Sequence, residues 1–151
     1  MDYLPITLKI TSTRILIVGG GKVATHKAQI LSRFTHKATV IAKEISDGIK
    51  ALPFHTVEKE FEPSDLEGVQ LLFVCTGNHE LNHRIKELAS ERGILTSVCD
   101  DPGVCDFISP AIYRNENITI AVGSDSKDVK RSIRIRDRIK ELIEHDILRI
   151  D

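Results

Sequence analysis

The apolar residues of this chain gather in short continuous runs, which alternate with segments whose apolar residues recur at helical spacing. The first strong run is Ile15–Val18, directly before three glycines. Further runs cover Ala38–Ala42, 71–75 and 94–99. Such runs are typical of strands that are buried on both faces, as in parallel sheets. The pattern therefore predicts a parallel sheet with at least these strands.

Two segments between these runs have the spacing of amphipathic helices. Residues 22–34 place small and branched apolar side chains on one face, and a second periodic segment at 81–92 is ended by Gly93. Weaker apolar stretches at 4–10 and 56–61 are interpreted as an edge strand and a further strand. The alternation of strands and helices predicts a doubly wound α/β fold.

The pattern changes near Pro110. Apolar runs at 111–113 and 118–122 flank four turn-forming residues, which predicts a hairpin. A final helix follows, apolar on one face and basic on the other. We expect one domain at 1–112 and a small α+β unit at 113–151, with the boundary placed to within several residues. The small unit has too little core to fold alone, so it should pack on the first domain, build a homodimer, or both.

Composition places the chain among folded intracellular proteins. Hydrophobic residues make up 41% of its 151 residues and charged residues 28%, which suits a packed core. The formal net charge of -1 argues against a nucleic-acid partner. The three cysteines have neither a CxxC nor a zinc-site spacing, so a reducing cytoplasmic location is the simplest interpretation. No signal peptide and no membrane segment is evident, so no membrane association is expected.

The segment between the first strand and the first helix has the chemistry of a dinucleotide-binding loop. It satisfies the pattern G-x-G-x-x-A with Gly19, Gly20, Gly21, Lys22, Val23 and Ala24. In this pattern the first glycine permits a tight turn, the third lets the backbone approach a pyrophosphate, and the alanine allows close helix–sheet packing. The helix N-terminus then faces the phosphates. We therefore expect residues 1–112 to form a Rossmann-type NAD(P)-binding domain, with a simple glycine turn as the alternative interpretation.

Two charged residues after the second strand bear on the choice of nucleotide. Glu44 is placed to hold the ribose hydroxyls of NAD, although it lies slightly late, whereas Lys43 is placed to attract the 2′-phosphate of NADP. Both also fit the interpretation of solvated loop charges. We expect NAD as the cofactor, and NADP stays open.

Two adjacent carboxylates follow the strand at 94–99. Asp100 and Asp101 are expected at the carboxyl end of the sheet, where catalytic groups of open α/β folds collect. Repulsion between them can raise one pKa and suit that group to acid–base chemistry. On composition alone, a turn that ends the strand is the better explanation. His79 and His83 have the spacing of two metal ligands on a helix, but no third ligand is evident, so we expect a surface pair and no metal site.

Three stretches of the chain match a known family in order and spacing. They are Tyr3-Leu4-Pro5-Ile6 with the glycine loop and Lys27-Ala28, then Cys75-Thr76-Gly77-Asn78 with Asn82, then Val98-Cys99-Asp100-Asp101-Pro102 with Cys105-Asp106-Phe107 and Pro110-Ala111. Over most of residues 1–125 the chain resembles the precorrin-2 dehydrogenase and sirohydrochlorin ferrochelatase family, the N-terminal module of siroheme synthase. The resemblance implies NAD-dependent oxidation of precorrin-2 to sirohydrochlorin in sirohaem biosynthesis. Some members also insert ferrous iron, as a substrate, into that product.

The resemblance also implies roles for individual residues. Asp100, and not Asp101, falls on the position of the family's catalytic aspartate and would act as the general base. Thr76 would line the nucleotide site, and a role as a helix or turn cap is compatible with this. Ser124 matches a substrate-contact position, although the loop at 123–128 otherwise departs from the family's Ser- and Gly-rich loop.

The final helix and the loop before it carry an excess of positive charge. Seven basic residues occur from Lys127 to Lys140, against two acids. A solvated helix face explains most of them, but such a surface would also attract the carboxylate-rimmed tetrapyrrole that the resemblance implies. Lys127 and Arg131 are therefore substrate-binding candidates. An RNA partner also fits the charge, but no aromatic platform accompanies it.

Two classes of function are consistent with these residues. The first is a precorrin-2 dehydrogenase, with or without ferrous iron insertion, that acts as a homodimer built largely on residues after 112. The second is a non-catalytic NAD(P)-binding module, such as a regulatory or redox-sensing domain. Both need the glycine loop, and only the enzyme needs Asp100 beside the nicotinamide and a basic surface facing it.

Overall fold

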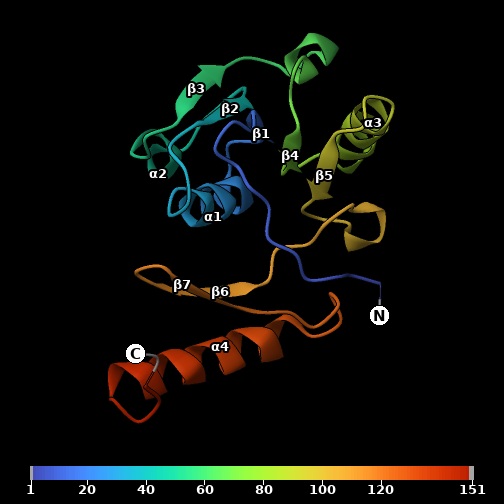
Figure 1. The fold of residues 1–151 in the computed structure, drawn as a ribbon. Coiled ribbons are helices and arrows are strands. Elements are labelled where there is room, and N and C mark those ends of the chain that lie inside the picture. The colour runs from blue at the N-terminus through green and yellow to red at the C-terminus, as the bar shows by residue number, and fades with distance from the viewer. Residues whose placement is uncertain (1, 150–151) are drawn as a thin grey trace. The chain divides into compact units, whose positions relative to one another are not determined.

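The computed structural model describes residues 2–149, and the chain divides into two compact units. The larger unit is Ile6–Phe107, and the smaller unit combines Met1–Pro5 with Ile108–Asp151. The division lies a few residues before the expected boundary at 112. Each unit has a sheet of its own (Figure 1).

A five-stranded parallel sheet forms the centre of the larger unit (Figure 1). Its strands are β1 (Ile15–Val18), β2 (Ala38–Ala42), β3 (His55–Glu58), β4 (Leu71–Val74) and β5 (Leu95–Val98). Their order is β3-β2-β1-β4-β5, so the chain builds outward from β1 on one side and then returns to the other side. The predicted Rossmann-type doubly wound sheet is confirmed, and its switch point lies between β1 and β4.

Helices cover both faces of this sheet. The two long ones are α1 (Lys22–Leu31) and α3 (His79–Ser90). Ile15 and Ile17 of β1 face a core shared with α1, whereas Leu16 and Val18 face a core shared with α3. Because both faces of β1 are covered, all its side chains are apolar, which explains the continuous run in the sequence. A short helix α2 (Asp47–Lys50) and 3₁₀ turns at Pro63–Leu66 and Pro102–Val104 complete the unit.

The structure corrects two of the expected elements near the N-terminus. The edge strand expected at 4–10 is absent: most of these residues are exposed, and Pro5 has no backbone N–H to offer a neighbouring strand. The first helix ends at Leu31, not at residue 34. The chain leaves it in a tight turn in which the Phe34 N–H donates to the Leu31 carbonyl at 2.9 Å.

Two further boundaries differ from the sequence prediction. The weak strand expected at 56–61 is β3, which ends at Glu58. Helix α3 begins at His79, not at residue 81, because Asn78 caps it: the Asn78 side-chain oxygen accepts the Leu81 N–H at 3.0 Å. The earlier start places His79 in the first turn, close to the carboxyl ends of β4 and β5.

The smaller unit combines an antiparallel hairpin with a helix (Figure 1). Strands β6 (Ala111–Asn115) and β7 (Ile118–Val122) confirm the predicted hairpin. Strand β6 extends beyond the expected residue 113, so the turn is only Glu116-Asn117, with Glu116 at φ 48°. Helix α4 (Val129–Glu144) begins after Asp128, whose side chain accepts the Arg131 N–H at 2.8 Å. Within residues 2–149, no helix has the length and apolarity needed to cross a membrane.

Candidate nucleotide and catalytic site

The glycine loop follows β1 at the switch point, and two of its glycines have no room for a side chain. Gly19 has φ +131°, and a Cβ there would lie 2.3 Å from the Cys75 carbonyl oxygen. A Cβ on Gly20 would lie 1.9 Å from the Glu44 carbonyl oxygen. The Gly20 carbonyl in turn accepts the Ser46 N–H at 3.0 Å. The loop is therefore clamped between the ends of β2 and β4, a role for Gly20 that the motif alone did not indicate.

The third glycine leaves open space beside the backbone. A Cβ on Gly21 would meet no atom within 4 Å. Gly21 is also the N-cap of α1 and supplies no side-chain acceptor, so the first N–H groups of this helix are available to an anion. Ala24 has no exposed surface and packs between α1 and the sheet. Open space and available N–H groups thus lie where the sequence predicts that a pyrophosphate binds.

A cavity of about 610 Å³ opens at the carboxyl ends of the strands, within the larger unit. This volume is in the range of small-molecule and cofactor sites. The predicted cofactor residues that line it are Gly19, Gly20, Gly21, Lys22, Val23, Lys43, Glu44 and Thr76. The sequence did not single out Lys59, Glu60 and Phe61, which also line the cavity. Their position just after β3 was the available signal, because parallel strands end at one edge of the sheet.

The charges on the rim of this cavity bear on the choice between NAD and NADP. Lys43 Nζ lies 2.6 Å from Glu60 Oε1, and both side chains are exposed. The hydrogen bond to Glu60 and its negative charge raise the pKa of Lys43. A 2′-phosphate would therefore have to compete with Glu60 for Lys43. Glu44 is exposed on the same rim, where a ribose hydroxyl could be held.

Asp100 follows β5 and is held by two side chains of α3. Asn82 Nδ2 donates to Asp100 Oδ1 at 2.9 Å, and His79 Nδ1 lies 3.1 Å from Asp100 Oδ2. Partial burial raises the pKa of Asp100, but the hydrogen bonds from His79 and Asn82 outweigh it, and the resulting pKa lies below the ordinary value. Asp100 is therefore a carboxylate at neutral pH.

The pKa of Asp100 is lowered, so the expected rise through repulsion does not occur at this carboxylate. The two carboxylates have different partners and do not share a site. Asp101 Oδ2 lies 3.0 Å from His83 Nε2, and Asp101 Oδ1 accepts the Gly103 N–H at 3.0 Å. Each carboxylate thus has hydrogen-bonding groups of its own.

A chain of hydrogen bonds links the cavity to Asp100. Thr76 lines the cavity, and its hydroxyl group bonds to Asn82 Oδ1 and to the Asn78 carbonyl. Asn82 is completely buried and also donates to the Thr76 carbonyl at 3.2 Å. Sequence reasoning placed Thr76 in the site but gave Asn82 no role. The available signal was its spacing: Asn82 lies three residues before the buried Ile85 and therefore on the face of α3 that packs against the core.

The structure also joins two cysteines at this edge of the sheet. Cys75 and Cys99, the residues that follow β4 and β5, form a disulfide with their Cα atoms 5.2 Å apart. Cys75 lines the cavity, and Cys99 immediately precedes Asp100. The third cysteine, Cys105, is a free thiol. The pairing was not predicted, because only the parallel alignment of β4 and β5 brings these positions together.

The predicted substrate residues Ser124, Lys127 and Arg131 belong to the smaller unit. Ser124 Oγ accepts the Asp128 N–H at 3.1 Å and lines a small cavity of about 40 Å³. Lys127 Nζ is paired with Asp125 Oδ2 at 3.0 Å. Arg131 donates its backbone N–H to the cap of α4, and its side chain is exposed.

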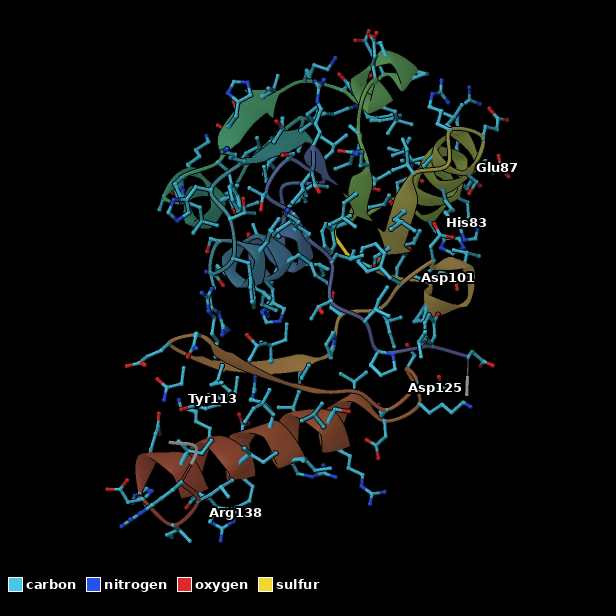
Figure 2. The ribbon with its side chains drawn as sticks, viewed as in Figure 1. His83, Glu87, Asp101, Tyr113, Asp125 and Arg138 are labelled. Atoms are coloured by element: carbon cyan, nitrogen blue, oxygen red, sulfur yellow. A yellow bond between two sulfur atoms is a disulfide. The ribbon has the colours of Figure 1, made fainter. Side chains whose placement is uncertain are left out.

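Asp125 organises the loop at 123–128 that departs from the family pattern. Its side chain is only 7% exposed. Asp125, which is labelled in Figure 2, accepts the backbone N–H groups of Asp2 at 2.9 Å and Tyr3 at 3.1 Å through Oδ1. The Asp2 N–H, then Lys127, then the Tyr3 N–H lower the pKa of Asp125. This loop therefore anchors the N-terminal residues to the smaller unit.

The basic residues from 127 to 140 fall into two groups. Four are engaged: Lys127 with Asp125, Arg136 with Asp137 and the Ile112 carbonyl, Arg138 with Glu141, and Lys140 with Glu144. Among the residues that the structure describes, Lys130, Arg131 and Arg134 form no side-chain ion pair. These three carry the charge that remains available to a ligand.

Comparison with known proteins identifies the larger unit. Residues 6–111 match a family model described as "Putative NAD(P)-binding". The chain belongs to this NAD(P)-binding family. The match includes the glycine loop, all five parallel strands and Asp100.

The curated relatives confirm the resemblance to siroheme synthases. The chain is 34% identical over 149 residues to siroheme synthase of Vesicomyosocius okutanii subsp. Calyptogena okutanii, covering 96% of this chain and 32% of that protein. It is 35% identical over 147 residues to siroheme synthase of Methylococcus capsulatus, covering 95% and 31%. The chain thus spans about a third of the length of these relatives.

A solved structure named "SirC, precorrin-2 dehydrogenase" has a similar fold. It matches with a TM-score of 0.80 at 20% sequence identity, covering 92% of this chain and 70% of that chain. At this identity the likeness supports the fold of the chain.

Proposed function

We propose that this chain oxidises precorrin-2 to sirohydrochlorin with NAD as the oxidant. In this reaction NAD⁺ takes a hydride from the substrate, a second hydrogen leaves as a proton, and sirohydrochlorin, NADH and H⁺ are formed. The single observation that carries the proposal is the position of Asp100, which Asn82 and His79 hold at the carboxyl edge of an NAD(P)-binding sheet. The names of the relatives and of the solved structure supply the substrate class.

Each element of the site has a defined part in this proposal. The glycine loop and the N-terminus of α1 would hold the pyrophosphate of the dinucleotide, and its nicotinamide would supply the hydride-accepting chemistry when bound. Asp100 accepts the proton, and its lowered pKa keeps it ionised for that step. Asn82 and His79 are positioning residues that orient the carboxylate.

The substrate carboxylates would be attracted by the smaller unit. Lys130, Arg131 and Arg134 lie on α4 without ion-pair partners among the described residues. Guanidinium groups bind carboxylates in a bidentate manner. We therefore propose Arg131, Lys130 and Arg134 as substrate contacts. Lys127 would have to exchange its ion pair with Asp125 for one with the substrate, and Ser124 would contribute its hydroxyl group.

The test is a turnover assay with purified chain, NAD and enzymatically made precorrin-2, followed by sirohydrochlorin absorbance. Asp100→Ala should abolish turnover and leave NAD affinity nearly unchanged, because Asp100 does not line the cavity. The matched control is Asp47→Ala, at an exposed position that does not line the cavity either. Equal turnover in Asp100→Ala and Asp47→Ala would remove Asp100 from the mechanism.

Three further predictions belong to this proposal. Incubation of the chain with sirohydrochlorin and ferrous iron as substrates would show whether it also inserts the metal. A homodimer built on residues after 112 stays a prediction, in which the side chain of Ile133 on α4, 39% exposed, would be covered. The cytoplasmic location stays a prediction.

A specific observation favours a second function, that of a redox-sensing NAD(P)-binding module. The disulfide between Cys75 and Cys99 joins the wall of the nucleotide cavity to the strand end that carries Asp100. A sensor would bind NAD differently in its oxidised and reduced forms and would not turn over precorrin-2. Turnover together with equal NAD affinity in both forms would rule this function out.

A further inference from the structure

A second cluster of chemically capable side chains lies outside the nucleotide cavity. His79 and His83 occupy successive turns of α3, and Asp101 follows β5. Figure 2 labels His83 and Asp101, whose side chains are in contact. One ligand atom from each of the three residues lies within 4.8 Å of the others. None of the three lines the cavity of the glycine loop. The fold thus supplies the third ligand that the histidine spacing lacked in the sequence, where only a surface pair was expected.

One contact within this cluster has the length expected between two ligands of a metal ion. His83 Nε2 lies 3.0 Å from Asp101 Oδ2. Two donor atoms that each lie about 2 Å from a shared ion are separated by roughly 3 Å. The His79 and His83 rings are tilted by 56° to one another, with centroids 4.3 Å apart. All three donor atoms lie within 4.8 Å of one another, so side-chain rotations that shorten the longer separations would direct them at one point.

Neighbouring groups hold the ligands in place. Asp101 Oδ1 is occupied by the Gly103 N–H, which leaves Oδ2 as the metal-facing oxygen. His79 Nδ1 contacts the Asp100 carboxylate at 3.1 Å, and metal-ligating histidines commonly make such a contact with their second ring nitrogen. The two carboxylates also offset the positive end of the α3 dipole, which would otherwise disfavour a cation there.

We propose that His79, His83 and Asp101 bind a divalent transition-metal ion. Two imidazoles and one carboxylate suit Zn²⁺, Co²⁺ or Fe²⁺, whereas Mg²⁺ and Ca²⁺ prefer all-oxygen sites. The side chains of His79, His83 and Asp101 are 63%, 36% and 29% exposed, so water or another ligand can complete the coordination. The site is open and suits an exchangeable ion. The proposal does not depend on the oxidation of precorrin-2.

The experiment is a Co²⁺ titration of the whole purified chain, with any affinity tag removed, followed by visible absorption. His83→Ala and Asp101→Asn should each weaken Co²⁺ binding by at least about 10-fold. Asparagine at 101 still accepts the Gly103 N–H, so the loop is preserved. The matched control is His55→Ala, because His55 is an exposed histidine on β3 at the opposite edge of the sheet. The Co²⁺ affinity of this variant should differ from that of the wild-type chain by less than about twofold.

A second measurement uses the unmutated chain and so does not depend on the folding of a variant. In NMR spectra of the histidine rings, Zn²⁺ should shift the signals of His79 and His83 and leave that of His55 in place. Equal Co²⁺ affinity in all forms, no Co²⁺ binding at millimolar concentration, or Zn²⁺ shifts confined to other histidines would each overturn the proposal. NAD binding is measured in parallel, and its loss counts against the proposed function alone.

Discussion

The buried Asn82 side chain connects the nucleotide cavity to Asp100, and its removal tests how the carboxylate is held. Asn82→Ala deletes the amide that donates to Asp100 Oδ1 at 2.9 Å and to the Thr76 carbonyl at 3.2 Å. Asn82 has no exposed surface, so the cavity left behind must either admit water or leave the two acceptors without a donor.

The size of the effect follows from these contacts. A buried acceptor that loses its donor costs about 1–3 kcal/mol of unfolding free energy. The Asp100 side chain is 40% exposed and is partly rehydrated, so we expect a total near the lower half of that range. For a chain of this size the melting temperature should fall by about 2–4 °C for each kcal/mol lost. Turnover should fall because Asp100 is no longer oriented, whereas NAD affinity should persist because Asn82 does not line the cavity.

The assay compares Asn82→Ala with Asn78→Ala in the same helix. Asn78→Ala removes the α3 cap, which costs about 1 kcal/mol, whereas the side chains that bond to the Asp100 carboxylate are His79 and Asn82. The hydrogen bonds from His79 and Asn82 hold the pKa of Asp100 below its ordinary value. Removal of the Asn82 amide should therefore raise the pKa of Asp100. The acid limb of the kcat–pH profile should then move to higher pH in Asn82→Ala but not in Asn78→Ala.

The pH dependence of stability has a defined sign. Because the pKa of Asp100 is lower in the folded chain, its carboxylate stabilises the fold above the ordinary pKa near 3.8, and this contribution is lost as pH falls through the lowered value. The part of the stability lost in Asn82→Ala that comes from the bond to Asp100 should disappear in the same acidic range, because the wild-type chain also loses this contribution there. Identical kcat–pH profiles for Asn82→Ala and Asn78→Ala would refute the assigned role of Asn82.

Three other changes test separate parts of the molecule. Gly20→Ala places a Cβ 1.9 Å from the Glu44 carbonyl oxygen, so it should lower the free energy of unfolding by about 1–3 kcal/mol and abolish NAD binding in a calorimetric titration. In the control Gly123→Ala the new Cβ meets nothing within 4 Å, so neither quantity should change. Glu60→Gln releases Lys43 and should raise the affinity for NADP relative to NAD by up to about fivefold; an unchanged ratio would exclude Lys43 from phosphate recognition. Ile133→Glu should convert a homodimer to a monomer in light scattering, and a wild-type chain that is already monomeric would contradict the dimer.

The parallel sheet was predictable because burial on both faces leaves a direct signal in the sequence. The run Ile15–Val18 is apolar at every position, and the structure places alternate residues in two different cores. The glycine loop was predictable for a related reason. Its pattern reflects close approaches of the backbone, which the structure shows at Gly19 and Gly20.

Contacts between residues distant in sequence were not predictable from the pattern. The Asn82–Asp100 hydrogen bond and the Cys75–Cys99 disulfide depend on the register of β4 with β5 and on where α3 begins. Because Asn78 caps α3, the helix begins at His79, and the His79 ring contacts Asp100. Asp125 is a similar case, because its partners Asp2 and Tyr3 lie at the other end of the chain.

The most direct test of the proposed function is the stoichiometry of a single turnover. Purified chain, NAD and precorrin-2 are mixed, and NADH and sirohydrochlorin are followed together by their absorbance. Hydride transfer to the nicotinamide predicts one NADH for each sirohydrochlorin formed, and no product with Asp100→Ala. Tight NAD binding without either product would contradict the account.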